Sequence, residues 1–195
     1  DVGGGLSSAE VGLRVAGEHQ VSNALAAATA GLALGLPLGQ VCAALSAAES
    51  RSKWRMQLEE RSDGLLVVND AYNANPDSMR AAIDSSIGLR RPGGRVVAVL
   101  GDMLELGPDS PRLHAQIGEY AASAGVDQLV AVGEQARHLA DGFARHGGAA
   151  DIAANRCEAA KLAQTRATPR DVVLVKASRG LALETVAEEI ASEAR

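Results

Sequence analysis

Aromatic residues are scarce in this sequence, at 2% of the chain, so large rings cannot supply most of its core. The hydrophobic share is nevertheless 47%, which is ordinary for a globular protein and excludes a disordered chain. Alanine, valine and leucine must therefore build the interior. With 195 residues, the chain can form one core, or one complete domain and a piece of another, and we favour the second arrangement.

Cysteine is limited to Cys42 and Cys157, which lie far apart in Ala-rich patterns typical of helices. They have no C-x-x-C pair and no nearby His to complete a metal site. We interpret both as reduced core thiols of a cytoplasmic protein. The sequence thus predicts no metal-binding residues.

Long apolar runs and an excess of basic residues are also missing. The longest apolar stretch, residues 21–36, is shorter than the roughly 20 residues that span a bilayer. The first residues, DVGGGLSS, do not resemble a signal peptide, and we interpret them as a cut inside a longer chain. A formal charge of -5, with both signs interspersed, offers no basic face to nucleic acid. We expect neither a membrane nor a nucleic-acid partner.

The sequence predicts a pair of helices near its start, over residues 21–34 and 41–48. Both segments are rich in Ala and Leu, which favour helices. Charged residues and then an alternating, strand-like segment follow this pair. We place a domain boundary near Ser50, which assigns residues 1–50 to one domain and residues 51–195 to another.

Short β-branched runs alternate with amphipathic helical stretches over the rest of the chain. A weaker strand is expected at residues 151–154, before a helix from Glu158. Four stronger runs are LLVV from Leu65, VVAVL from Val96, QLVAV from Gln128 and VVLV from Val172. This alternation predicts an α/β fold, a Rossmann-like parallel sheet with helices on both faces.

Polar residues follow the predicted strands. In an open parallel sheet, ligands bind beyond the carboxyl ends of the strands, where loops and helix amino-termini converge. One edge of the sheet is therefore expected to carry Asp70, Asn73, Asn75, Asp102, Glu105, Glu134, Lys176, Ser178 and Arg179.

Structural roles compete with functional ones at several of these positions. Asn75 stands before a proline and a polar first turn, and for this residue we favour helix capping. Asp70 and Asp102 occupy strand ends where an apolar residue would serve folding better, so both interpretations stay open. Lys176 follows VVLV directly and either reaches solvent or offers a cation to a ligand.

Four short motifs occur in a fixed order along the chain. They are GEHQVSNALAAA from Gly17, NDAYNANPDSM from Asn69, VLGDMLELG from Val99 and VLVKASRGLALE from Val173. Together they resemble the signatures of the Mur ligase family, and the second and third resemble the branch that adds D-alanyl-D-alanine. Four motifs in family order over most of the chain make the resemblance specific.

The resemblance implies a three-domain ligase. This chain would hold the last helices of the central ATP-binding domain and the whole carboxyl-terminal Rossmann-like domain. The amino-terminal UDP-sugar domain would lie outside it, and the sequence contains no G-x-x-G-K-[ST] phosphate loop. Because phosphoryl transfer then lacks the loop that binds the ATP phosphates, the chain alone is expected to be inactive and to bind no cofactor tightly.

The reaction that the resemblance implies is amide-bond formation driven by ATP with Mg2+. The terminal carboxylate of UDP-MurNAc-tripeptide is phosphorylated, and the amine of D-Ala-D-Ala displaces phosphate from the acyl phosphate. The parent enzyme would act in peptidoglycan biosynthesis, and through cell wall biogenesis in cell shape, the cell cycle and cell division. We expect a cytoplasmic monomer.

Positions within the family motifs imply roles for individual residues. His19 and Asn23 match residues that contact adenine, and their i, i+4 spacing puts them on one helical face. Arg55 is expected near the ATP phosphates, and Asp70 matches an Asp that accepts hydrogen bonds from ribose hydroxyls. Arg55 and Lys176 are the candidates for a catalytic role.

The candidates for binding the dipeptide and the acceptor peptide are Asn73, Asn75, Asp102, Lys176, Ser178 and Arg179. Two positions depart from the family pattern: Gln20 replaces the usual Asn, and Trp54 replaces the Gly before Arg55. His114 recurs in the pattern, but it lies on a predicted helix, and we interpret it as structural.

Two alternative functions stay open. A folylpolyglutamate or cyanophycin synthetase would share the fold and the first motif, although the YNANPDSM and GDMLELG strings argue against both. A non-catalytic Rossmann-like module that binds a nucleotide or a peptide would share only the fold. The ligase hypothesis requires a G-T-N-G-K-T string upstream in the parent gene, whereas the binding-module hypothesis does not.

Overall fold

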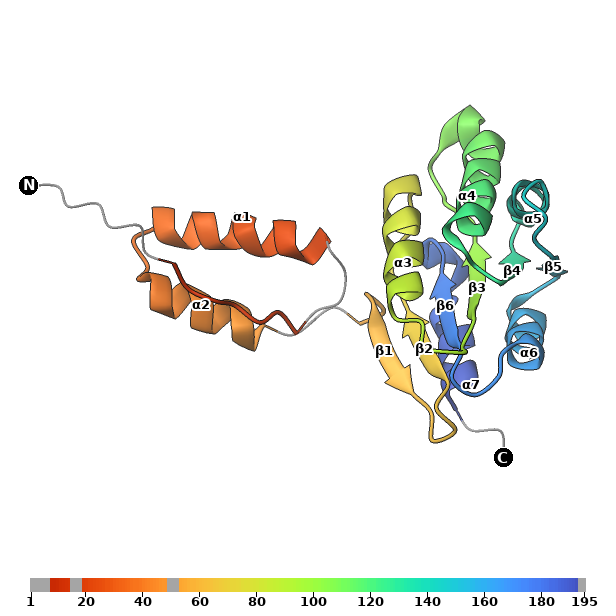
Figure 1. Ribbon diagram of the computed structural model, residues 1–195. Coiled ribbons are helices and arrows are strands. Elements are labelled where there is room, and N and C mark those ends of the chain that lie inside the picture. The colour runs from red at the N-terminus through yellow and green to blue at the C-terminus, as the bar shows by residue number, and fades with distance from the viewer. Residues whose placement is uncertain (1–7, 15–18, 49–52, 193–195) are drawn as a thin grey trace, which may run out of the picture. The chain divides into compact units, whose positions relative to one another are not determined.

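The computed structural model describes residues 8–14, 19–48 and 53–192 (Figure 1). The chain divides into two compact units, Asp1–Arg51 and Ser52–Arg195. The assignment of the first unit to an ATP-binding domain remains a proposal.

The first unit contains two helices, α1 (His19–Ala33) and α2 (Leu38–Ala47). Gly35, with φ of 84°, provides the left-handed turn between them. Gly31 lets the helices approach closely, since a Cβ there would lie 3.2 Å from the buried Val41. The predicted helical pair is therefore present.

The second unit is built on a six-stranded sheet in the order β1-β2-β6-β3-β4-β5 (Figure 1). The strands are β1 (Gln57–Glu60), β2 (Leu66–Asn69), β3 (Val96–Gly101), β4 (Gln128–Val132), β5 (Ala150–Ala153) and β6 (Val172–Lys176). Strands β2 to β6 run parallel, as the α/β pattern predicts. β1 is antiparallel to β2, because a connection as short as residues 61–65 can only form a hairpin.

Helices cover both faces of this sheet, which confirms the predicted fold class. They are α3 (Pro76–Gly88), α4 (Ser110–Ala124), α5 (Ala136–Ala144), α6 (Arg156–Arg166) and α7 (Glu184–Ala191), with short 3-10 turns η1 (Gly107–Asp109) and η2 (Arg179–Leu181). Side chains alternate along each strand, so Val96 and Ala98 pack with α3, α4 and α5. Their neighbours Val97 and Val99 pack with α6 and α7.

The two cysteines are free, but the expectation that both are core thiols is wrong. Cys157 is exposed and Cys42 is only partly buried. An Ala-rich helix does not by itself define a buried stripe, and Ala159, Ala160 and Ala163 fill the buried face of α6 instead. Within the described ranges, no helix combines the length and the apolarity that crossing a membrane requires.

Candidate functional site

Three adjacent strands end at one edge of the sheet and deliver the candidate residues to it. β2, β6 and β3 are neighbours, and the chain leaves them at Asn69, Lys176 and Gly101. The loops that follow carry the polar motifs. The backbone Ser178 N–H donates to the Asp102 carbonyl at 2.9 Å, which ties two of these loops together.

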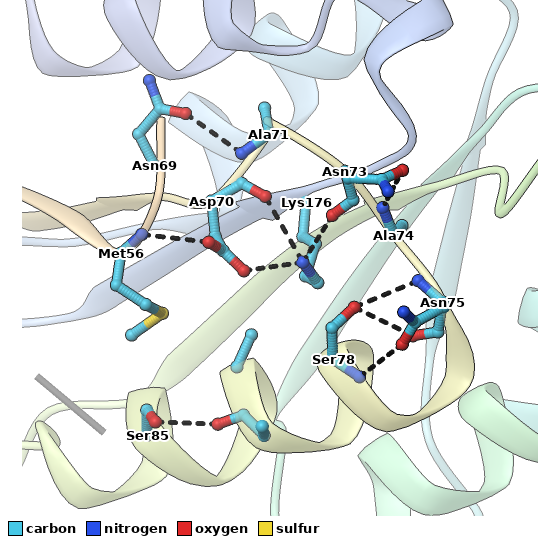
Figure 2. Close-up of polar contacts among 12 residues, drawn as sticks. Met56, Asn69, Asp70, Ala71, Asn73, Ala74, Asn75, Ser78, Ser85 and Lys176 are labelled. Carbon is cyan, nitrogen blue, oxygen red and sulfur yellow. Dashed lines mark hydrogen bonds and ion pairs between the residues drawn. The ribbon is translucent and has the colours of Figure 1, made fainter. Parts of the chain in front are cut away.

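Lys176 lies at the centre of the site (Figure 2). Its side chain is only 2% exposed, and its Nζ lies 2.6 Å from Asp70 Oδ2. The same ammonium group donates to the backbone carbonyls of Asn73, at 2.7 Å, and of Asp70, at 3.5 Å. All three donors of the ammonium group are thus directed at protein acceptors, and Lys176 orders the loop that follows β2.

Burial lowers the pKa of Lys176, because desolvation disfavours the charged form. The Asp70 carboxylate opposes this shift by its charge and its hydrogen bond, while the positive charge of Arg55 adds to it. Lys176 is therefore a buried lysine whose charged form is stabilised by Asp70.

The second oxygen of Asp70 fixes the turn that enters β1. Asp70 Oδ1 accepts a hydrogen bond from the Met56 backbone N–H at 2.9 Å. The Tyr72 N–H donates to the Trp54 carbonyl at 3.0 Å. Trp54 and Met56 have φ values of 60° and 47°, in the left-handed region that costs most residues conformational energy. This backbone explains why a Gly at the position of Trp54 suits the family pattern.

Two arginines stack on aromatic rings beside this turn. The guanidinium carbon of Arg55 lies 4.2 Å from the Tyr72 ring centroid, and that of Arg179 lies 4.2 Å from the Trp54 ring centroid. Arg179 also pairs with Glu184 at 2.5 Å. Arg55 is exposed and the Arg179 side chain is 49% exposed, so both can still donate to an anion.

Asp102 is buried, and both of its oxygens accept backbone hydrogen bonds. Oδ2 accepts from Glu134 N–H and Oδ1 accepts from Gln135 N–H, each at 2.9 Å. Gly133, with φ of 114°, is required here because a Cβ would lie 2.5 Å from the Asp102 carboxylate. In this arrangement Asp102 ties the loop after β3 to the loop after β4.

Ser178 joins the loops after β2, β3 and β6. Its Oγ accepts from the Leu104 N–H at 2.9 Å and donates to the Ala74 carbonyl at 3.3 Å. Asn75 caps α3, because its side-chain oxygen accepts from the Ser78 N–H at 2.8 Å and Ser78 Oγ accepts from the Asn75 N–H at 3.0 Å (Figure 2). Asn73 is exposed, and its side-chain oxygen accepts from the Ala74 N–H.

His114 is buried and contacts the loop after β3 through a hydrogen bond with Met103. Its Nε2 accepts from the Met103 N–H at 2.8 Å, and its Nδ1 donates to the Ser110 carbonyl at 2.7 Å. These partners require the neutral ring, because a backbone N–H can only donate. Burial lowers the pKa of His114, against the raising effects of the Ser110 hydrogen bond and the Asp102 charge. Its contacts are therefore structural.

The candidates for adenine contact belong to the first unit. His19 is the first residue of α1, and its side chain lies outside the described residues. Asn23 is exposed and donates to the Gln20 side-chain oxygen at 3.1 Å. Gln20, which replaces the usual Asn of the family motif, thus contacts Asn23 of the same motif.

Sequence reasoning missed Tyr72 and Glu184 and recorded Trp54 only as a departure. Tyr72 stands inside a polar motif, where its ring could have suggested a platform for a cation. Glu184 begins α7, and an acidic residue in a first helical turn is ordinary, so no local signal distinguishes it. Only the fold brings it to Arg179.

Residues 54–179 match the family described as "Mur ligase, glutamate ligase domain". A UDP-N-acetylmuramoyl-tripeptide--D-alanyl-D-alanine ligase of Mycobacterium tuberculosis is 42% identical over 96% of this chain and 40% of the relative. The Bacillus subtilis protein of the same name is 34% identical over 90% of this chain and 38% of the relative.

Solved structures of this family resemble the chain as well. The chain is similar to MurF from Acinetobacter baumannii, with a TM-score of 0.82 and 34% identity over 94% of this chain and 40% of that one. MurF ligase from Thermotoga maritima in complex with ADP gives a TM-score of 0.74 and 27% identity over 90% of this chain and 38% of that one. The chain therefore spans about two fifths of the length of these relatives.

A mostly parallel sheet with helices on both faces, whose strands end in a cluster of cations and carboxylates, places the second unit in the Rossmann-like class. Within that class, the chain belongs to the Mur ligase family, by its match to the glutamate ligase domain over residues 54–179.

Proposed function

We propose that this chain is part of an ATP-dependent ligase that adds D-alanyl-D-alanine to UDP-MurNAc-tripeptide in peptidoglycan precursor synthesis. The observation that carries the proposal is the sheet edge itself. There the buried Lys176–Asp70 pair stands beside two accessible arginines, Arg55 and Arg179, in a chain similar to ligases named for this reaction.

The residues present fit a nucleotide at one side of the edge. Arg55 offers an exposed guanidinium that suits phosphate oxygens. Each Asp70 oxygen accepts one hydrogen bond and retains a lone pair for a ribose hydroxyl. His19 and Asn23 remain the candidates for adenine. When bound, ATP would supply the activation of a carboxylate by phosphorylation.

This chain's own residues then hold and orient the amine-bearing substrate. Arg179 would bind the carboxylate of the dipeptide, and the loop of Asn73, ordered by Lys176, would face its amine with carbonyl and amide oxygens. Asn75, Asp102 and Ser178 support these loops through the backbone contacts described above, and we propose that they shape the site.

We also propose Mg2+ as the companion of the ATP phosphates and the cytoplasm as the location of the reaction. Among the residues that the structure describes, no group of three or more His, Cys, Asp or Glu side chains could hold a metal ion. Roles in cell shape, the cell cycle and cell division would follow from cell wall biogenesis.

Calorimetric titration tests the proposal on this chain. We expect weak but saturable binding of D-Ala-D-Ala, strong reduction by Arg179→Ala, and reduction by Lys176→Ala. Arg145→Ala is the matched control, because Arg145 is also exposed and paired with a glutamate, but ends α5 away from the site. Equal binding by all variants, or no binding by the unmodified chain, would overturn the dipeptide assignment.

A further inference from the structure

Glu184 is a buried carboxylate that the proposed reaction does not use. The residue is 8% exposed, and its Oε1 lies 2.5 Å from Arg179 Nη1. Among the described residues, its Oε2 is buried and has no hydrogen-bond partner. A buried, half-satisfied carboxylate lowers stability, so its position calls for an explanation.

Trp54 contacts the same arginine through a second kind of interaction. The guanidinium carbon of Arg179 lies 4.2 Å from the centroid of the indole ring, the geometry of a cation–π contact. Trp54 adopts φ of 60°, which disfavours a large residue. Both side chains that contact Arg179 are therefore held at a cost in stability, Glu184 by its burial and Trp54 by its backbone conformation.

The backbone between Arg179 and Glu184 is shaped to bring them together. Ala182 has φ of 51°, and its N–H donates to the Arg179 carbonyl at 3.1 Å. Leu183 is fully buried and anchors the start of α7. This left-handed turn directs Glu184 back toward the arginine. Since the Arg179 side chain is still 49% exposed, the pairing holds the guanidinium without burying it.

We propose that Glu184 and Trp54 are positioning residues, which fix Arg179 so that it receives the carboxylate of the D-Ala-D-Ala dipeptide. This inference rests on the proposed function. A flexible arginine loses side-chain entropy when it binds, whereas one held between a carboxylate and a ring has lost it beforehand. The planar guanidinium then meets the dipeptide carboxylate with two parallel hydrogen bonds.

The single tryptophan of the sequence makes this testable, because Trp54 is the only indole that fluoresces. Glu184→Gln keeps the shape of the side chain and removes its charge. Glu188→Gln makes the same change at an exposed position one turn along α7 and serves as the control. Each variant is checked for folding by circular dichroism, and its tryptophan emission is recorded with and without D-Ala-D-Ala.

Calorimetry with two ligands supplies the second readout. The probes are D-Ala-D-Ala and its carboxyl-terminal amide, which lacks the charged carboxylate. For the unmodified chain we expect the acid to bind more tightly than the amide. In Glu184→Gln we expect the dissociation constant of the acid to rise roughly tenfold, with that of the amide almost unchanged. Trp54→Leu should act in the same direction, and it covers the case in which Glu184→Gln does not fold.

The outcomes separate this inference from the function on which it rests. If the unmodified chain binds neither ligand, the dipeptide site itself is wrong. If it binds the acid, but Glu184→Gln and Trp54→Leu keep the same preference for acid over amide, the positioning role is overturned. A change in ATP affinity without a change in dipeptide affinity would also overturn it, because Arg179 would then serve phosphate.

Discussion

Lys176 and Asp70 end up 2.6 Å apart because β6 and β2 are adjacent parallel strands. In the sequence, 106 positions separate them. The pair is almost fully buried on the lysine side and 14% exposed on the aspartate side, so water can reach Asp70 alone. This asymmetry leaves the carboxylate available to a ligand while the cation stays fixed.

Removing the cation should destabilise the fold. Lys176→Ala leaves the mostly buried Asp70 carboxylate unpaired and frees the Asn73 carbonyl, so we expect the free energy of unfolding to fall by about 2–4 kcal/mol. Urea denaturation measures this loss. Lys161→Ala, at an exposed position on α6, should change the stability by less than about 0.5 kcal/mol.

Asp102 should behave as a structural residue in the same assay. Asp102→Ala removes the acceptor of two backbone N–H groups, at Glu134 and Gln135, and we expect a loss of about 2–3 kcal/mol. Asp141→Ala, at an exposed position on α5, is the control. If Asp102→Ala keeps its stability but binds the dipeptide more weakly, Asp102 contacts the ligand and its role is not structural.

Asn75 offers a way to separate capping from binding. Asn75→Ala removes the side-chain oxygen that accepts from the Ser78 N–H but keeps the backbone N–H that donates to Ser78 Oγ, and should cost about 1 kcal/mol, whereas Asn75→Ser retains a capping oxygen and should cost less. Thermal unfolding of both variants measures the difference. If both weaken dipeptide binding equally, whatever their stability, Asn75 contacts the ligand directly.

His114 should make the stability depend on pH. Burial lowers its pKa below the ordinary 6.5, so between the folded value and 6.5 the unfolded chain binds more protons than the folded one. The free energy of unfolding should therefore fall as the pH drops below 6.5, with a slope of up to about 1.4 kcal/mol per pH unit. His114→Gln should show a shallower slope in urea titrations between pH 5.5 and 7, an interval set by the ordinary histidine pKa of about 6.5. An identical slope would contradict the neutral, buried ring.

Much of the fold could be predicted because hydrophobic patterning determines it locally. Runs such as Val96–Gly101 are apolar on both faces, which is typical of a parallel sheet covered by helices on both sides. The direction of β1 follows from the short connection of residues 61–65. The strand itself is hard to distinguish from a loop in the sequence, because most of its residues are exposed.

The site could be predicted only in part. Strand-end polar residues gather at one edge by topology, which the sequence reveals, and Asp70 and Lys176 follow this rule. Which of them keeps a free hydrogen-bonding group depends on three-dimensional partners that the sequence does not reveal. Thus Asp102 is occupied by backbone N–H groups, while Glu184 becomes relevant only through the left-handed turn at Ala182.

Binding of the dipeptide at the carboxyl edge of β2, β3 and β6 is the prediction on which the other functional assignments depend. Amide chemical shifts of the labelled chain, followed by nuclear magnetic resonance during titration with D-Ala-D-Ala, test it most directly. We predict that saturable shifts cluster at residues 70–75, 102–105 and 176–181. Shifts confined to the opposite edge, at residues 61–65 and 168–171, or spread evenly over the sheet, would contradict binding at the carboxyl edge.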